Sequence, residues 1–330
     1  AASLVIATIG LAAALVFLMQ IGFMLLEAGA VRTKNAVNVA QKNLLDFVFA
    51  TLAFAAIGFA LAFGASAALL PIGAEPRFVL LGGLAPEEVT FFVFQAMFCG
   101  TAATIVAGAV AERMRLSAYV VSTLVIAALI YPATVHWAWG SALAPASGAW
   151  LAALGFVDFA GATVVHATGA FVALAACLAL GPRQGRFDAA GRPVRIAGHS
   201  PVLSAAGALV LFIGWIGFNG GSTLAASPAV PEIVLATMLA GVAGGAAGYL
   251  GGWSRDGRLP PERPVNGVIG GLVAVTAGCH LLAPGAAILV GFLGGLVANA
   301  TNRLLETRAR LDDVVGVVGA HGAAGVLGTL

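Results

Sequence analysis

Ten apolar stretches, each long enough to cross a lipid bilayer, make up most of this 330-residue sequence. A helix needs ~20 mostly apolar residues to span a membrane. Within hydrocarbon every backbone polar group must find a partner inside the protein, which helices provide. We therefore expect an all-α polytopic membrane protein, with helices at 2–30, 44–70, 89–111, 117–139, 158–181, 199–222, 229–253, 266–282, 285–302 and 313–330.

The composition excludes an ordinary soluble protein, because 60% of the residues are hydrophobic and only 9% are charged. The net charge of +2 gives no reason to expect a nucleic-acid partner. Cys99, Cys177 and Cys279 lie far apart in apolar stretches, so neither a metal site nor a disulfide is expected. The sequence therefore predicts one membrane domain over residues 1–330, with the bilayer as partner and no cofactor.

The basic residues predict the orientation in the membrane. Of the 16 Lys and Arg residues, only Arg77 lies outside the connections that follow the first, third, fifth, seventh and ninth predicted helices. Cytoplasmic loops are enriched in Lys and Arg, so we expect a cell (inner) membrane protein with its N-terminus outside. The predicted cytoplasmic residues are Arg32, Lys34, Lys42, Arg113, Arg115, Arg183, Arg186, Arg192, Arg195, Arg255, Arg258, Arg263, Arg303, Arg308 and Arg310.

Two apolar segments share an unusual spacing of Asp, Gly and His. They read DFAGATVVH at 158–166 and DVVGVVGAH at 313–321, and F-x3-I-G-F likewise occurs at 17–23 and 212–218. The two His-bearing helices are predicted to run in opposite directions, and each His lies about 12 Å along the helix from its Asp, near the membrane centre. This pattern predicts an inverted repeat of five plus five helices, about 1–181 and 199–330, with a substrate site between the halves.

The two histidines of this repeat are the strongest candidates for function. A single buried His would most simply join two helices by a hydrogen bond, but two in symmetric positions favour a functional pair. Because burial disfavours the charged imidazole, His166 and His321 are expected to be neutral, each with one donor and one acceptor. Asp158 could cap its helix or attract a cation, whereas Asp313, beside Asp312, is expected to be a cap.

Seven motifs extend this pattern from the first predicted helix to the last: GFMLLEAGAVRTKN, NVAQKNLLDF, FQAMFCGTAATIVAGAVAERMRLSAY, HWAWG, DFAGATVVHATGA, GWIGFNGGS and GAHGAAGVLGTL. Together they resemble the ammonium transporter family of Amt, MEP and Rhesus proteins, on the Amt side. The resemblance implies a homotrimer with one pore per subunit, carrying ammonium or ammonia. It also implies an eleventh helix and a tail after Leu330, where a cytoplasmic regulatory protein could bind, so either the chain is part of a longer one or the fold is trimmed.

The resemblance places a recruitment site for the ammonium ion at the outer mouth. It assigns this site to Trp139 and Ser222, with Trp150 as a rival for the Trp position and Asp158 in the same vestibule. An aromatic face attracts a cation by about 0.5–2 kcal/mol, and a hydroxyl accepts an N–H bond. The simpler interpretation of Trp139 is an aromatic residue at the membrane interface.

The resemblance also assigns the residues that line the pore. Phe98 and Phe218 correspond to two stacked rings that close the outer mouth, whereas Phe94 is expected to be ordinary packing. The further positions toward the cytoplasm are His166, His321, Trp215 and Thr276.

Chemistry explains why such a pore would select ammonium. Moving an ion into an apolar channel is costly, but ammonium can lose a proton and cross as neutral ammonia, which K+ and Na+ cannot do. We expect ammonium transport by deprotonation at the outer site and conduction past the histidines. The alternatives are a passive ammonia channel and the sensor domain of a signalling fusion. An enzyme is not expected, because neither His has a metal-ligand partner at i+4 or a nucleophile paired with it.

Overall fold

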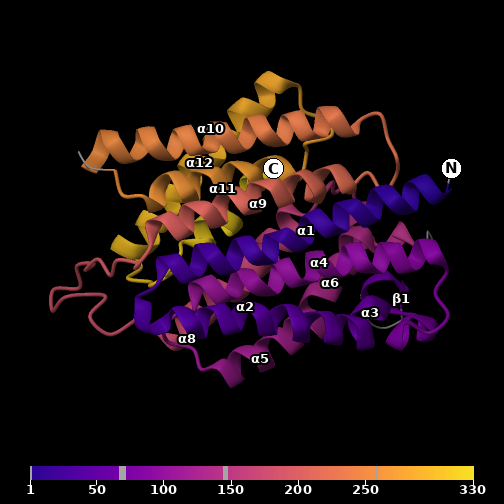
Figure 1. Ribbon diagram of the computed structural model, residues 1–330, viewed down its shortest axis with the longest axis horizontal. Coiled ribbons are helices and arrows are strands. Elements are labelled where there is room, and N and C mark those ends of the chain that lie inside the picture. The colour runs from indigo at the N-terminus through magenta and orange to yellow at the C-terminus, as the bar shows by residue number, and fades with distance from the viewer. Residues whose placement is uncertain (1, 67–71, 144–147, 257–258) are drawn as a thin grey trace.

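A computed structural model of the chain describes residues 2–66, 72–143, 148–256 and 259–330. Its long helices lie side by side along one axis (Figure 1). Among the described residues, eight helical rods are long and apolar enough to cross a membrane, which confirms the all-α polytopic fold class. They are Ala2–Ala30, Thr33–Phe63, Pro86–Ala109, Leu116–Ala142, Ala162–Leu180, Pro201–Gly221, Val230–Gly252 and Pro284–Thr307.

Several rods are built from more than one helical element. Four of the described elements are π-helical turns within a longer rod: η1, η3, η5 and η6. In chain order the helices are α1 (Ala2–Ala30), α2 (Thr33–Ala53), η1 (Phe54–Gly58), α3 (Phe59–Phe63), α4 (Pro86–Ala109), α5 (Leu116–Val125), η3 (Ile126–Ile130), α6 (Tyr131–Trp139), α7 (Trp150–Ala153), η5 (Ala162–Ala167), α8 (Thr168–Leu180), α9 (Pro201–Gly221), α10 (Val230–Asp256), α11 (Glu262–Thr276), α12 (Pro284–Thr307), η6 (Val318–Ala323) and α13 (Ala324–Thr329).

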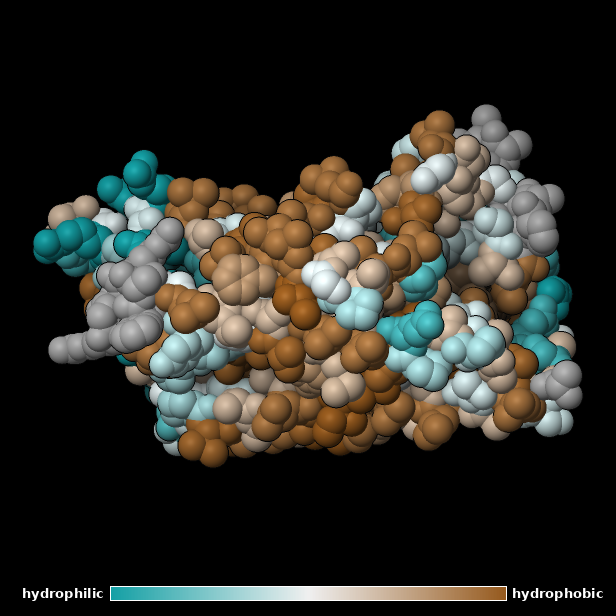
Figure 2. Space-filling model, turned by 90° about the horizontal axis from the view of Figure 1, so that it is seen from above, coloured by the Kyte–Doolittle hydropathy of each residue, from teal (hydrophilic) through white to brown (hydrophobic). Residues whose placement is uncertain are grey.

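Short elements cover the end of the bundle at which α1 begins, which we call the N-terminal end. Strands β1 (Ala65–Ser66) and β2 (Gly73–Ala74) pair antiparallel there, and the 3-10 turns are η2 (Pro76–Leu81) and η4 (Gly140–Ala142). The opposite end carries Arg32, Arg113, Arg183 and Arg186, and we call it the arginine-rich end. In Figure 2 brown hydrophobic residues fill the middle of the visible face, while teal hydrophilic ones gather toward its two ends.

The structure corrects several predicted helix boundaries; for example, 266–282 becomes Glu262–Thr276 and 285–302 becomes Pro284–Thr307. The second helix begins at Thr33, not at 44, so Lys42 lies within α2 and is fully buried instead of facing the cytoplasm in a connection. The helical turns that carry the histidines begin at Ala162 and Val318, not at 158 and 313. Lys42 packs inside the protein, whereas Asp158 and Asp313 precede the turns whose backbone N–H groups they bond, so polar residues did not mark where these helices begin. Among the predicted basic positions, the side chain of Arg255 and all of Arg258 lie outside the described residues.

Glycines let neighbouring helices approach until their backbones nearly touch. A Cβ atom on Gly22 of α1 would lie 2.9 Å from the Leu211 backbone nitrogen of α9. A Cβ on Gly271 of α11 or on Gly295 of α12 would lie 3.0 or 2.8 Å from the Cα of Gly244 in α10. Small residues are enriched where membrane helices pack closely, so α10, α11 and α12 form one tightly joined group around Gly244.

Candidate functional site

A cavity of about 280 Å³ opens at the N-terminal end of the bundle, between the start of α4 and the ends of α6 and α9. Three of its lining residues were predicted as site residues: Trp139, Ser222 and Phe98. None of the lining residues carries a charge. The full lining is Phe91, Phe94, Gln95, Phe98, Trp139, Ser141, Ala142, Phe159, Ser222 and Leu224.

Hydrogen bonds hold the Trp139 ring and the Ser222 hydroxyl at the cavity. The Trp139 indole Nε1 donates to the Asp158 carbonyl at 2.7 Å, which fixes the ring. The Ser222 hydroxyl donates to the Phe218 carbonyl at 2.8 Å, which leaves its oxygen lone pairs to accept a further bond. Trp150, the rival position, is 44% exposed and packs on Trp137. The structure therefore brings Trp139 into this cavity, and not Trp150.

Two stacked phenylalanine rings close the floor of the cavity. The rings of Phe98 and Phe218 lie 3.9 Å apart at an interplanar angle of 11°, and both side chains are buried. Phe94 lies one helical turn before Phe98, at 4.6 Å between ring centroids. Phe94 packs against Phe98 and also lines the cavity. The prediction of ordinary packing did not include this second position. The F-x3-F spacing, which puts both rings on one helix face, was the signal that could have found it.

Beneath these rings the two histidines meet in the protein interior. The Nδ1 atoms of His166 and His321 lie 3.2 Å apart, and both side chains are almost fully buried. One ring must donate and the other accept, so the pair shares a single proton across this contact. His166 also stacks on Trp215 at 5.0 Å, and Trp215 donates its indole N–H to the Thr276 hydroxyl at 2.9 Å. All four predicted pore residues thus lie in one connected group.

Each histidine sits in a π-helical turn that an aspartate holds from the preceding residues. Asp158 accepts backbone N–H bonds at 2.8–2.9 Å from Gly161, Ala162, Thr163 and Val164. Asp313 does the same for Gly316 and Val318 at 3.0 and 2.7 Å. Gly161 and Gly316 both adopt positive φ, 105° and 82°, a conformation that favours glycine.

This geometry shows the capping arrangement considered for Asp158. All four backbone donors bind its carboxylate oxygens, so Asp158 holds the turn of His166 as a cap at a helix N-terminus does. Asp158 is not among the residues that line the cavity, and attraction of a cation by its charge stays a prediction. Across the described part of the chain, no three His, Cys, Asp or Glu side chains converge as metal ligands would.

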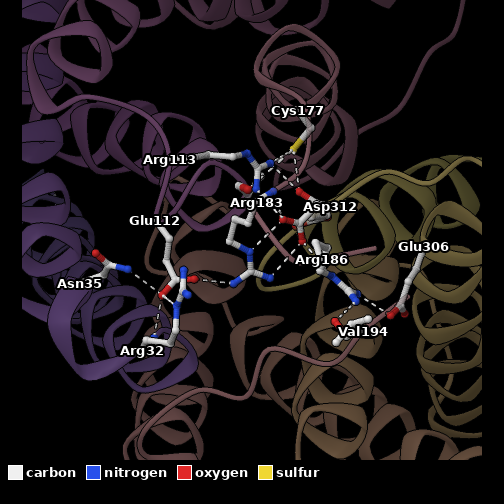
Figure 3. Close-up of polar contacts among 12 residues, drawn as sticks. Arg32, Asn35, Glu112, Arg113, Cys177, Arg183, Arg186, Val194, Glu306 and Asp312 are labelled. Atoms are coloured by element: carbon white, nitrogen blue, oxygen red, sulfur yellow. Dashed lines mark hydrogen bonds and ion pairs between the residues drawn. The ribbon is translucent and has the colours of Figure 1, made fainter. Parts of the chain in front are cut away.

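A cluster of ion pairs at the arginine-rich end joins the two halves of the chain (Figure 3). Arg183 bonds Glu112 at 2.7 Å through Nη1, and Asp312 at 2.8 Å through Nε. Arg113 and Arg186 also bond Asp312, each at 3.1 Å. Sequence reasoning used these arginines only to predict orientation. The carboxylates adjacent to them in AERMR and LDD were the signal for a cluster.

Electrostatics keep the carboxylates of this cluster charged. Burial raises the pKa of Glu112, but hydrogen bonds from Arg32, Asn35 and Arg183 outweigh burial and lower the pKa to about 2. Burial likewise opposes ionisation of Asp312, and its bonds from Arg183 lower the pKa below the usual value. Both side chains therefore remain anions between their arginine partners.

A second cavity, of about 370 Å³, opens at the arginine-rich end. Its walls include the end of α1, the end of α12 and the 313–316 segment that precedes the turn of His321. The side chains of Asn299, Asn302 and Arg303 line it where the other cavity has aromatic rings. The two ends thus offer opposite chemistry, with ring faces at one and amides with arginines at the other.

Comparisons with known proteins show which family this chain is similar to. The model of the Ammonium Transporter Family matches residues 7–330. A Synechocystis sp. relative is 44% identical over 97% of this chain and 59% of its own length. The ammonium transporter Amt2 of Archaeoglobus fulgidus is 40% identical over 96% of this chain and 68% of its own length. This chain thus spans only part of both relatives.

Two solved structures have the same fold. A structure described as a sensor Amt protein superposes with a TM-score of 0.95 at 37% identity, and the match covers 98% of this chain and 80% of that one. Mep2 of Candida albicans superposes with a TM-score of 0.87 at 29% identity, and here the match covers 98% and 71%.

Proposed function

The chain belongs to the ammonium transporter family, and we propose that it transports ammonium across a membrane. Members of this family are transporters and not enzymes. One observation carries the proposal: an uncharged aromatic cavity, a stacked pair of rings and a buried histidine pair follow one another in contact. Phe218, which forms the ring pair with Phe98, also lies 5.3 Å from the His166 ring, so the elements are continuous.

Each element supplies one step. Ring faces of the cavity attract the cation, and Ser222 accepts one of its N–H bonds. Below the stacked rings the surroundings are apolar, where a charged ion is far less stable than a neutral amine. The ammonium ion therefore gives up a proton, which an imidazole nitrogen of the histidine pair accepts and passes on toward the cytoplasm, and ammonia passes His166 and His321. An alkali cation has no proton to release and stops at the cavity.

The proposal includes an orientation and an assembly. The N-terminal end with its aromatic cavity faces the outside, and the arginine-rich end faces the cytoplasm of a cell (inner) membrane. The concentration of Arg at that end supports this orientation. Three copies assemble as a homotrimer, each with its own pore, as the resemblance to the family implies.

The test is the current evoked by ammonium in the purified protein, reconstituted in liposomes on a supported membrane. We expect a current with NH4+ and none with equal concentrations of K+ or Na+. Equal currents with K+ and NH4+ would contradict selection by deprotonation. An ammonia flux without any current would instead identify a passive ammonia channel.

Replacing Trp139 by leucine is expected to weaken recruitment without closing the pore. The loss of a cation–π contact of about 0.5–2 kcal/mol corresponds to an increase of about two- to thirtyfold in the ammonium concentration at half-maximal current. Titration of the current with ammonium measures this change. Trp150→Leu is the matched control, since Trp150 lies outside the cavity, and a similar change in that variant would contradict the assignment.

A second candidate function is ammonium sensing. The high structural similarity to the sensor Amt protein, with a TM-score of 0.95, favours it. In that case the same cavity binds ammonium and the signal passes to a further domain. Sequencing the gene beyond the codon for Leu330 separates the candidates, because a sensor requires a signalling module there. Ammonium binding to the complete protein without current or ammonia flux would also favour sensing.

A further inference from the structure

A set of polar side chains, separate from the pore, lies buried between α1, α2 and α4, which run side by side in Figure 1. We call this set the polar seam. Glu27 is 1% exposed, and Lys42 and Asp46 are fully buried. Ionisable residues inside a membrane protein are costly and usually have a function. The complete seam is Gln20, Glu27, Lys42, Asn43, Asp46, Thr104 and Tyr119.

Helical spacing brings these residues together. Gln20 and Glu27 are seven residues apart on α1 and share one face. Gly100, Thr104 and Gly108 follow one another at intervals of four residues on α4, so they share one face. The two glycines leave space for the side chains of α1. A Cβ on Gly108 would lie 3.2 Å from Glu27 Oε1, and a Cβ on Gly100 would lie 2.9 Å from Gln20 Nε2. The seam is therefore built into the contact between the helices.

Hydrogen bonds connect most of the seam. Asn43 donates to Glu27 Oε2 at 2.8 Å and accepts from the Thr104 hydroxyl at 3.0 Å. Tyr119 donates to Asp46 Oδ2 at 2.6 Å. In the described part of the chain, five of the eleven buried side-chain atoms without a hydrogen-bond partner belong to this seam. They are Glu27 Oε1, Asp46 Oδ1, Lys42 Nζ and both amide atoms of Gln20, so all three charged groups of the seam are incompletely bonded.

The charged groups of the seam do not balance one another. Two carboxylates and one ammonium group give a net charge of −1, which is unfavourable in a low-dielectric interior. Binding one proton makes the seam neutral. Arg113 also interacts electrostatically with Lys42, but its guanidinium donates to Asp312 and Cys177 and not to residues of the seam. The seam therefore has two states, a neutral one with a proton and a negative one without it.

The seam lies beside the inner histidine. Phe23, one helical turn before Glu27 on α1, contacts the His321 ring at 5.9 Å between centroids. Gly108 lies between the seam and the turn that carries His321. A Cβ added to Gly108, which would lie close to Glu27 Oε1, would also lie 3.1 Å from Cγ1 of Val317, the residue before that turn. A charge in the seam thus acts on the histidine pair across apolar side chains, where electrostatic interactions are poorly screened.

We propose that Glu27, Lys42 and Asp46 form the counter-ion of the histidine pair during transport. This inference rests on the proposed function. When ammonium loses a proton to the pair, an N–H bond of ammonium breaks and an N–H bond of imidazole forms. At the same time the carboxyl O–H bond of the seam breaks, and water at the cytoplasmic face accepts this proton as hydronium. The pair then carries +1 and the seam −1, and no uncompensated charge is left in the membrane interior.

The test uses Glu27→Gln and Asp46→Asn. Each variant leaves one carboxylate beside the Lys42 ammonium group, so the seam is neutral and no longer needs a proton that it can release. Both variants should assemble, since the amide oxygen introduced by Glu27→Gln can still accept the Asn43 bond and that introduced by Asp46→Asn the Tyr119 bond. Ammonium-evoked current should fall by about a hundredfold, as expected when a positioned acid–base group is removed. The ammonium concentration at half-maximal signal should stay unchanged. Glu232→Gln, at an exposed carboxylate of α10, is the control and should behave as the wild type.

Infrared spectroscopy provides a readout that a merely structural role would not alter. The wild-type protein should show a carboxylic acid C=O band that changes when ammonium is added, and Glu27→Gln or Asp46→Asn should remove it. Wild-type currents in both variants, with the band retained, would overturn the proposal. If the wild type gives no current but the band is present and removed by the variants, the labile proton stands and the transport proposal fails.

Discussion

Replacing His166 or His321 by alanine should abolish the ammonium current while the protein still assembles. Each imidazole is the polar partner of the other at 3.2 Å in the interior, and its removal leaves a migrating ammonia molecule or proton in an apolar channel. An unpaired polar group in such surroundings costs several kcal/mol. Even ~2 kcal/mol corresponds to a loss of about thirtyfold in rate. Currents on a supported membrane measure the loss.

His136 provides the matched control for the pair. It is also fully buried, but it bonds the Ala62 carbonyl at 3.0 Å and Ser66 at 2.9 Å, away from the two central histidines. His136→Gln should keep the ammonium current. If His166→Ala and His321→Ala conducted ammonium with wild-type selectivity, the histidines would be structural links and the proposed route would be wrong.

Replacing Arg183 by methionine should destabilise the protein far more than replacing an exposed arginine. In the described part of the chain, Arg183 bonds both Glu112 of the first half and Asp312 of the second. Its removal leaves Glu112 with Arg32, and Asp312 with Arg113 and Arg186, so the cost should lie near the lower end of the about 3–5 kcal/mol of a broken buried ion pair. Thermal unfolding in detergent, followed by the loss of the folded peak in size-exclusion chromatography, measures the change.

An exposed arginine serves as the comparison for Arg183. Arg192 pairs with Asp188, but its side chain is 80% exposed, and surface pairs contribute at most about 1 kcal/mol. Arg192→Met should therefore leave the midpoint of unfolding almost unchanged. Equal effects of the two substitutions would show that the buried cluster contributes no more than a surface ion pair.

The sequence predicted that the two histidines lie close together because spacing and loop charge constrain their positions from two directions. Opposite orientations of two similar segments require His166 and His321 to meet near the same depth, and the structure brings them into contact. The ring pair of Phe98 and Phe218 followed from the resemblance, residue by residue. The turns that Asp158 and Asp313 hold also share a local backbone structure, each with a glycine at positive φ before a π-helical turn.

The prediction failed where polar residues meet other helices instead of water. Lys42 was placed in a connection because a charge in an apolar chain usually marks a loop, yet α2 begins before it and buries it. The sequence does not show which helix lies opposite, so Glu27 and Asp46 gave no signal of a shared site. Gln95 was missed for the same reason: that it lines the cavity depends on the packing of α4 against α6 and α9.

The close approach around Gly244 limits how this protein can move. Where α10, α11 and α12 nearly touch by their backbones, no layer of side chains remains along which one helix could slide past another. Rocking of whole helices, which takes microseconds to milliseconds, would have to break these contacts. Ring rotations of Phe98 and Phe218 need no such rearrangement. Passage should therefore be gated by side chains on a stationary frame, and the turnover should exceed that of carriers that alternate between two shapes.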